Sequence, residues 1–200
     1  MTATAVLGTV AAASSLFFVW PQVVKLFRTG DVDGVSIPAT LFAMAGYVIW
    51  IFYGTREALP FVVAANVQAA VGFGLVVLMT ARRRPVEPTV WLGAAAGLAV
   101  VVLLFTLAPP AAFGALAVVV SSVGFVPQTV VALRESDLSG LSVWTYLLIA
   151  TSTAVWAAYG LGEADLVVAA PTLVVLPCTL TIAARIRFTG ATATPAVLVD

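Results

Sequence analysis

Residues 20–54, WPQVVKLFRTGDVDGVSIPATLFAMAGYVIWIFYG, have a second copy in this chain at residues 126–160, VPQTVVALRESDLSGLSVWTYLLIATSTAVWAAYG. Identical residues recur at one constant separation, 127 − 21 = 106. The pairs are Pro21/Pro127, Gln22/Gln128, Arg28/Arg134, Asp31/Asp137, Gly34/Gly140, Ser36/Ser142, Trp50/Trp156, Tyr53/Tyr159 and Gly54/Gly160. Without gaps from Gly8 to Ala58, about sixteen of some fifty positions match, whereas this composition would give roughly five by chance. The sequence therefore predicts an internal duplication.

The composition places the chain in a membrane and excludes several kinds of chemistry. Of its 200 residues, 62% are hydrophobic and 9% are charged, whereas a soluble domain is about a quarter charged. The net charge of zero argues against a nucleic-acid partner. The chain has no histidine, which excludes Ser-His and Cys-His catalysis and histidine-ligated metals. We expect Cys178 to be a packing residue, and we predict no enzyme activity, no metal and no cofactor.

Seven segments are long and apolar enough to span a bilayer, which requires about 20 residues. They are Ala5–Phe27, Ile37–Gly54, Leu59–Thr80, Val90–Ala108, Ala111–Leu133, Leu141–Gly160 and Leu166–Ile186. The sequence therefore predicts an all-α membrane protein with seven transmembrane helices.

Basic residues near the ends of the spans predict the orientation. If the spans alternate, all basic residues except Arg56 fall on one side: Lys25, Arg28, Arg82, Arg83, Arg84, Arg134, Arg185 and Arg187. We therefore expect an integral protein of the cell membrane with its N-terminus outside and its C-terminus in the cytoplasm. The N-terminus has no basic residue before its apolar run, so we expect no cleaved signal peptide.

The fourth span explains how two three-helix repeats can have the same orientation. Three is an odd number, so direct fusion would turn the second copy upside down, and one inverter helix corrects this. We predict a 3+1+3 arrangement of two parallel repeats, with residues 1–84 as the first repeat, 85–110 as the linker helix, 111–188 as the second repeat and 189–200 as a cytoplasmic tail. Parallel repeats are typical of transporters with a binding site at the repeat interface. The small-residue face Gly93–Gly97 favours close packing within the chain, and a homo-oligomer is left open.

Two prolines lie inside apolar spans, Pro21 and Pro127. A proline removes one helical hydrogen bond and kinks the helix, which here would free the carbonyls of Phe17 and Val123. The adjacent Gln22 and Gln128 can donate to open backbone carbonyls. Proline kinks are ordinary in membrane helices, but the symmetric placement of these two favours a pair of hinges.

A Trp and a Tyr three residues apart share one helix face at the outer end of two spans. These are Trp50 with Tyr53, and Trp156 with Tyr159. An interfacial aromatic belt is one interpretation. Because a belt does not explain identical residues at an identical separation, functional residues are the other.

Asn66 is a polar residue deep inside the third span. An unpaired buried amide costs roughly 2–7 kcal/mol, so the side chain must face protein or a wet cavity. The second and third spans form a hairpin, which places Asn66 at the depth of Trp50. The same separation from Trp156 leads to Thr172 in the second repeat. Tryptophan walls with a few amide or hydroxyl groups suit a neutral polyol, whereas the alternative is a simple bond between helices.

All nine acidic residues lie in predicted loops or tails. Proton- and ion-coupled carriers keep ionisable residues near the centre of a span. We therefore expect passive movement of a solute down its gradient.

Paired Pro-Gln motifs, three-span repeats and the 3+1+3 layout resemble the PQ-loop superfamily and, within it, the SWEET sugar transporters. The Trp50/Asn66 pattern also resembles the single-repeat SemiSWEETs. The resemblance implies that Trp50, Asn66, Trp156 and Thr172 contact sugar. It also implies that Pro21 and Pro127, with Gln22 and Gln128, form inner hinges, and that Tyr53 and Tyr159 form an outer gate. SWEETs usually have asparagine where this chain has Thr172.

The leading hypothesis is therefore a facilitative uniporter of mono- or disaccharides, with a small neutral solute and membrane lipid as partners. One alternative is a PQ-loop carrier of an amino acid or other metabolite, coupled through a carboxylate such as Asp137. Another is a membrane receptor that transports nothing, although the short loops give a partner protein little surface.

Overall fold

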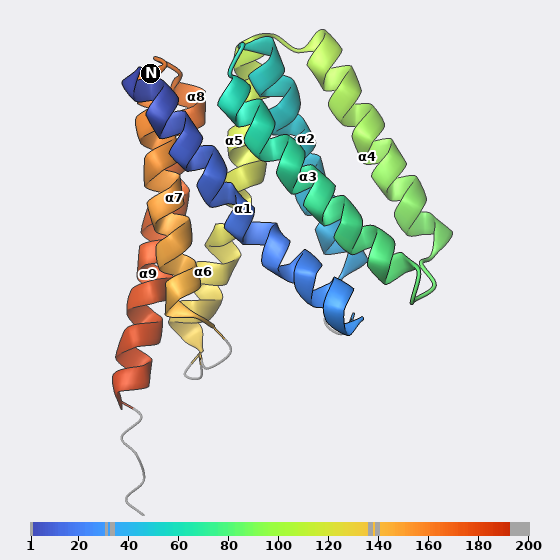
Figure 1. Ribbon diagram of the computed structural model, residues 1–200, viewed down its shortest axis with the longest axis vertical. Helices are drawn as coiled ribbons and strands as arrows, with labels where there is room; N and C mark the ends of the chain where they lie inside the picture. Colours follow the sequence, from blue (N-terminus) through green and yellow to red (C-terminus); the bar gives the residue numbers. More distant parts are fainter. Residues whose placement is uncertain (1, 31, 33–34, 136–137, 139–140, 193–200) are drawn as a thin grey trace, which may run out of the picture. The chain divides into compact units, whose positions relative to one another are not determined.

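A computed structural model describes residues 2–30, 32, 35–135, 138 and 141–192, with side-chain surroundings to residue 188. Its helices are α1 (Ala3–Thr29), α2 (Ile37–Arg56), α3 (Pro60–Ala81), α4 (Pro88–Leu107), α5 (Pro110–Val123), α6 (Phe125–Arg134), α7 (Val143–Gly162), α8 (Leu166–Ala169) and α9 (Thr172–Thr192) (Figure 1). The repeated residues Asp31, Asp137, Gly34 and Gly140, and residues 193–200 of the predicted tail, lie outside the described residues.

The predicted all-α class is confirmed. Two predicted spans are each divided into two helices, α5 with α6 and α8 with α9. In the described part of the chain, six segments are long and apolar enough to cross a membrane. They are Ala3–Thr29, Ile37–Arg56, Pro60–Ala81, Pro88–Leu107, Pro110–Arg134 and Leu166–Phe188. The remaining predicted span forms α7, whose Trp, Tyr, Ser and Thr residues make it less apolar.

Local sequence explains where the helices start and stop. The hydroxyls of Thr2 and Ser36 accept hydrogen bonds from the first turns of α1 and α2. Pro60, Pro88 and Pro110 are the first residues of α3, α4 and α5, where a missing N–H is harmless. Pro38, which has no partner in the second repeat, lies in the first turn of α2 for the same reason. Gly30 ends α1 with a left-handed φ of 69°.

The chain divides into two compact units, Met1–Ala117 and Val118–Asp200. In the first unit α3 packs against both α1 and α2, and in the second unit α9 packs against both α6 and α7. The third span is therefore the central helix of each repeat. This shared order of packing is the structural counterpart of the duplication.

Cores at the basic ends of the helices hold each unit together. In the first unit Val19, Val23 and Leu26 of α1 form a buried cluster with Val32 and Val76. In the second unit Ala132, Leu138 and Ile182 form a smaller one, which Leu141, Tyr146 and Ile186 surround. Such clusters hold the first and third spans of a repeat together by burying apolar surface.

Candidate functional site

The helical hairpins that position the predicted site have the same turn in both repeats. The backbone N–H groups of Glu57 and Glu163 bond to the carbonyls of Tyr53 and Tyr159, each at 3.0 Å. A second pair of backbone hydrogen bonds follows in each turn. The N–H groups of Leu59 and Asp165 bond to the carbonyls of Gly54 and Gly160, at 2.8 and 2.7 Å. Between them Ala58 and Ala164 have positive φ values of 54° and 58°. The duplication thus preserves the backbone of the turn down to its left-handed residue.

The repeated glycines allow the helices of each hairpin to approach closely. A Cβ at Gly54 would lie 3.0 Å from a methyl group of Val62. A Cβ at Gly160 would lie 2.9 Å from both the N of Ala169 and the O of Asp165, which are backbone atoms. A Cβ at Gly160 would overlap backbone atoms, whereas a Cβ at Gly54 would require only a small shift of valine side chains, so glycine is needed more strictly at Gly160.

The two Trp–Tyr pairs have the same geometry. The rings of Trp50 and Tyr53 meet edge to face at a centroid distance of 5.7 Å and 86°, and those of Trp156 and Tyr159 at 5.7 Å and 84°. Tyr53 is 4% exposed and Tyr159 is 1% exposed. A belt residue faces lipid, so the belt interpretation does not fit the buried tyrosines. Edge-to-face contact, at about 0.5–1.5 kcal/mol per pair, instead orients each half-buried tryptophan.

The side chains of Asn66 and Thr172 form different kinds of hydrogen bond. The Nδ2 of Asn66 donates to the carbonyl of Val62, one turn earlier in α3, at 2.7 Å. The hydroxyl of Thr172 donates across to α7, to the carbonyl of Thr153, at 3.3 Å. Thr172 thus makes the bond between helices that was the alternative interpretation, whereas the bond of Asn66 stays within its own helix. An amide that gives one N–H in this way still has a second N–H and an acceptor oxygen.

The predicted hinges differ between the repeats. Pro21 and Gln22 are exposed in α1, which continues through them without interruption. In the second repeat the helix is interrupted at Gly124, directly after Val123, the residue whose carbonyl Pro127 is expected to free. Gln128, which follows this proline, is half-buried, whereas Gln22 is exposed.

An open depression of about 730 Å³ lies at the turn of the α2–α3 hairpin and along the first half of α3. Its lining consists of Gly54, Thr55, Ala58, Leu59, Pro60, Val63, Ala64, Val67 and Gln68. Neither Trp50 nor Asn66 lines it, so it is not the predicted pocket. That pocket combines residues of both units, and its assembly stays a prediction.

Three arginines bond to backbone carbonyls in ways that the sequence did not indicate. Arg56 donates to the carbonyls of Phe105 and Ala108 at the end of α4, at 3.3 and 3.2 Å, and its guanidinium lies 5.8 Å from the ring centroid of Phe105. Arg84 donates to the carbonyl of Val32 at 2.7 Å. Arg185 donates to carbonyls at the end of α6. Cations are favourable at helix C-termini, because free carbonyls give these ends a partial negative charge.

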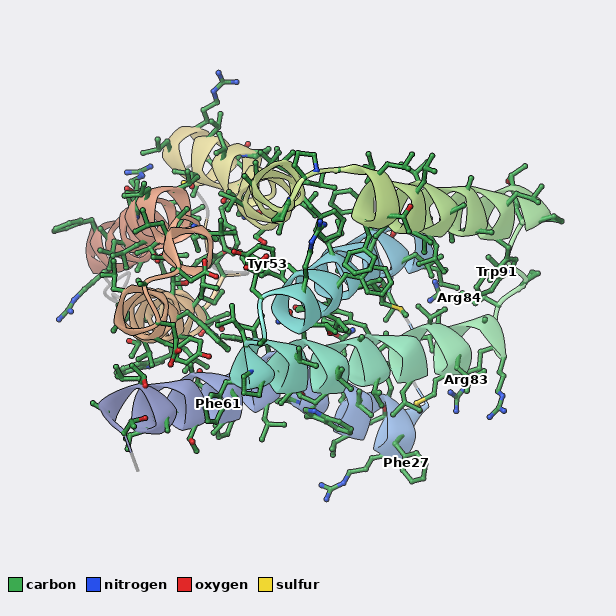
Figure 2. All side chains as sticks on the ribbon, turned by 90° about the horizontal axis from the view of Figure 1, so that it is seen from above. Phe27, Tyr53, Phe61, Arg83, Arg84 and Trp91 are labelled. Carbon is green, nitrogen blue, oxygen red and sulfur yellow. The ribbon has the colours of Figure 1, made fainter. Side chains whose placement is uncertain are left out.

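The basic residues of the first unit gather where prediction placed them. Figure 2 shows Arg83 and Arg84 at one end of α3 and Phe61 at the other, with Phe27 of α1 at the arginine end. Arg56 binds the opposite end, where α2 meets the end of α4. The ends of the helices in this unit therefore alternate as the basic residues predict.

Gly93 and Gly97 do not form a packing face within the described part of the chain. A Cβ added at either position would meet no described atom within 4 Å. The prediction that this small-residue face packs against another helix of the same chain is therefore not supported. The end of α4 is held instead by Phe105, whose ring packs against Phe52 at 4.8 Å and Phe113 at 5.6 Å.

These features define a class, an integral membrane protein built from two three-span helical repeats that are joined by one further span. Comparison with known proteins narrows the class. Residues 3–63 match the family model described as the PQ loop repeat. The structure is similar to that of a eukaryotic SWEET transporter solved at 3.7 Å resolution, with a TM-score of 0.73 and 15% identity, over 96% of this chain and 100% of the other. No curated protein matches this chain. The resemblance predicted from the Pro-Gln motifs is confirmed, and the predicted 3+1+3 fold is similar to that of the SWEET transporter.

Proposed function

We propose that this protein is a facilitative transporter of mono- or disaccharides that works by alternating access. The observation that supports this most is the pair of Trp–Tyr units, 106 residues apart and equal in geometry, within a fold similar to that of a SWEET transporter. A tryptophan from each repeat offers a flat apolar wall, and the apolar face of a sugar ring stacks on such a surface.

Asn66 supplies the polar part of the proposed recognition. Its bond to Val62 fixes the amide in one orientation and leaves donor and acceptor capacity for sugar hydroxyls. In the second repeat the Thr172 hydroxyl gives its proton to Thr153, so towards a solute it acts as an acceptor. The proposed site is therefore asymmetric, with its stronger polar contact in the first repeat.

The positions of the acidic residues favour uniport. The five acidic residues in the described part of the chain, Glu57, Glu87, Glu135, Glu163 and Asp165, all occupy helix caps. A proton relay in a carrier uses carboxylates or histidines within the spans. Movement of solute would thus follow its gradient. Asp137, the carboxylate that the alternative amino-acid carrier would use, lies outside the described residues.

A screen for thermal stabilisation of the purified protein tests the proposal. Monosaccharides, disaccharides and amino acids are each added, because a ligand at 100 times its dissociation constant stabilises the folded state by about 2.7 kcal/mol. We expect sugars to raise the melting temperature, and we expect Asn66→Ala to remove this shift. Thr9→Ala is the matched control, because Thr9 also bonds to a carbonyl four residues earlier, at 2.7 Å, but is exposed. Stabilisation by amino acids alone would contradict the sugar assignment, and an equal sugar shift in Asn66→Ala would remove this residue from the site.

A further inference from the structure

α1 comes very close to α3 at the two residues that precede Pro21. A Cβ at Gly72 would lie 2.6 Å from a methyl carbon of Val19, so only glycine permits this approach. At the next residue the indole Nε1 of Trp20 donates to Oε1 of Gln68 at 2.6 Å. Gln68 and Gly72 are one turn apart and therefore share a face of α3. We call Val19, Trp20, Gln68 and Gly72 the α1–α3 clamp.

Gln68 is held in the orientation that the clamp needs. Its Nε2 donates to the carbonyl of Ala65 at 2.9 Å, which leaves Oε1 directed to Trp20. Both side chains are partly buried. A bond between an indole and an amide is directional, so it fixes both helices at one point.

The second repeat has no clamp. The residues 106 positions later are Phe125, Val126, Val174 and Cys178. Two valine side chains cannot form a hydrogen bond with each other, and Cys178 has the Cβ that Gly72 lacks. It is here, at Gly124, that the helix is interrupted.

The contacts beyond Pro21 are of another kind. Val23 and Leu26 pack against Val76 through apolar surfaces, which have no directional preference and can slide. The Arg84 guanidinium reaches the carbonyl of Val32, which lies after the left-handed Gly30 that ends α1. These contacts restrain the inner segment of α1, Gln22–Thr29, less rigidly than the clamp restrains the outer segment, Ala3–Trp20.

We propose that Gln68 is a positioning residue, which fixes the outer segment Ala3–Trp20 of α1 to α3 and so restricts bending in the first repeat to Gln22–Thr29. The second repeat, which has valines at these positions, bends before its proline, at Gly124. This proposal assigns a positioning residue to the transport cycle proposed above, and its functional meaning rests on that proposed function. The two repeats then contribute unequally to the cycle, although their sequences are related.

Distances between spin labels within the first unit test this placement without any solute. Two pairs of exposed positions on α1 and α3 are labelled in a Cys178→Ala background, Val10 with Val67 for the outer segment and Val24 with Leu78 for the inner one. In lipid nanodiscs we expect a narrow distance distribution for the outer pair and a broader one for the inner pair. Gln68→Val, which copies the second repeat, should broaden the outer pair to the width of the inner pair.

Further variants separate the bond from general damage to the fold. Trp20→Phe removes the donor and keeps a ring, so it should broaden the outer pair as Gln68→Val does, and the double variant should broaden it no further. Gln68→Glu retains an acceptor for Trp20 and, in its protonated form, a donor for the carbonyl of Ala65, so at a pH at which it is protonated it should keep the outer pair narrow. Thr9→Val, which alters a bond within α1 alone, should have no effect. The proposal is overturned if the outer pair stays narrow in both Gln68→Val and Trp20→Phe, or if the inner pair is as narrow as the outer pair.

Transport provides a second and separate readout. In proteoliposomes we expect Gln68→Val to lower the maximal rate of sugar uptake several-fold with an unchanged half-saturation concentration, because Gln68 positions α1 and does not bind solute. A raised half-saturation concentration with an unchanged maximal rate would contradict the positioning role. Absence of sugar flux in the wild-type protein would contradict the proposed function, whereas the spin-label distances would still decide whether the clamp exists.

Discussion

The hairpins that join the second and third spans are close copies in the two repeats, whereas the first spans differ. Both hairpins have the same turn, a left-handed alanine, a glycine contact and a Trp–Tyr pair. By contrast, α1 is continuous and tied to α3 by Trp20, whereas its counterpart is divided at Gly124. Short-range sequence fixes a hairpin, so duplication preserves it. The position of the first span depends on a few contacts with the third, and these have diverged.

The largest effect that we expect distinguishes the two hairpin glycines. Gly160→Ala places a methyl group 2.9 Å from two backbone atoms, and overpacking of this kind costs about 1–3 kcal/mol. Gly54→Ala meets valine side chains, so its loss of unfolding free energy should be smaller. Thermal unfolding in detergent measures both, with Gly93→Ala as the control that meets no described atom within 4 Å. Equal losses at Gly54 and Gly160 would show that the hairpins are more alike than the contacts indicate.

The second prediction exchanges the polar residues of the proposed site. Asn66→Thr makes the first repeat resemble the second and should lower sugar uptake about tenfold, which corresponds to about 1.4 kcal/mol. Thr172→Asn should keep uptake within a few-fold of the wild-type rate. Initial rates in proteoliposomes measure both changes. A greater loss with Thr172→Asn than with Asn66→Thr would reverse the asymmetry that we propose.

The third prediction concerns the attachment of the linker helix. Arg56 binds the end of α4 in the first repeat, and the matching position in the second repeat is Gly162. Because Arg56 is exposed, we expect Arg56→Gln to lower the unfolding free energy by only about 0.5–1 kcal/mol. Arg56→Lys should retain part of this contribution. Added salt should reduce the difference between wild type and Arg56→Gln, and a difference that grows with salt would exclude an electrostatic role.

The smallest expected effect tests whether the two turns are equivalent. A left-handed conformation costs an L-residue roughly 1–2 kcal/mol, and glycine loses roughly 0.5–1 kcal/mol more than alanine in chain entropy on folding. Ala58→Gly and Ala164→Gly should therefore each stabilise the protein by about 0.5 kcal/mol. Equal rises in melting temperature would confirm that the turns are equivalent. A loss of stability in either variant would contradict the strain that the positive φ values imply.

Sequence alone predicts the features that depend on local pattern. The constant separation between copies, the apolar segments and the breakers between them identify the duplication and the class of fold. The same pattern cannot show that Ala111–Leu133 and Leu166–Ile186 are each interrupted, because Pro127 and Pro171 are tolerated in membrane helices when neighbours satisfy the backbone. Helix starts are missed by one or two residues at Pro88 and Pro110, which sequence presents as breakers but which fit the first turn.

Contacts between spans are less accessible from the sequence. Trp20 and Gln68 are polar groups inside spans, which is a signal, but nothing in their spacing of 48 residues pairs them. Gly93 and Gly97 have the spacing of a packing face, yet they meet no described atom within 4 Å. Asn66 and Thr172 occupy matching positions, and only the structure distinguishes a bond within one helix from a bond between two.

The most direct test of the central claim is uptake of labelled glucose and sucrose into proteoliposomes, with and without an imposed proton gradient. The account predicts saturable flux in both directions, equal with and without the gradient, and lost in Asn66→Ala. No flux above that of protein-free liposomes would contradict a sugar transporter, and flux that occurs only with a proton gradient would contradict uniport.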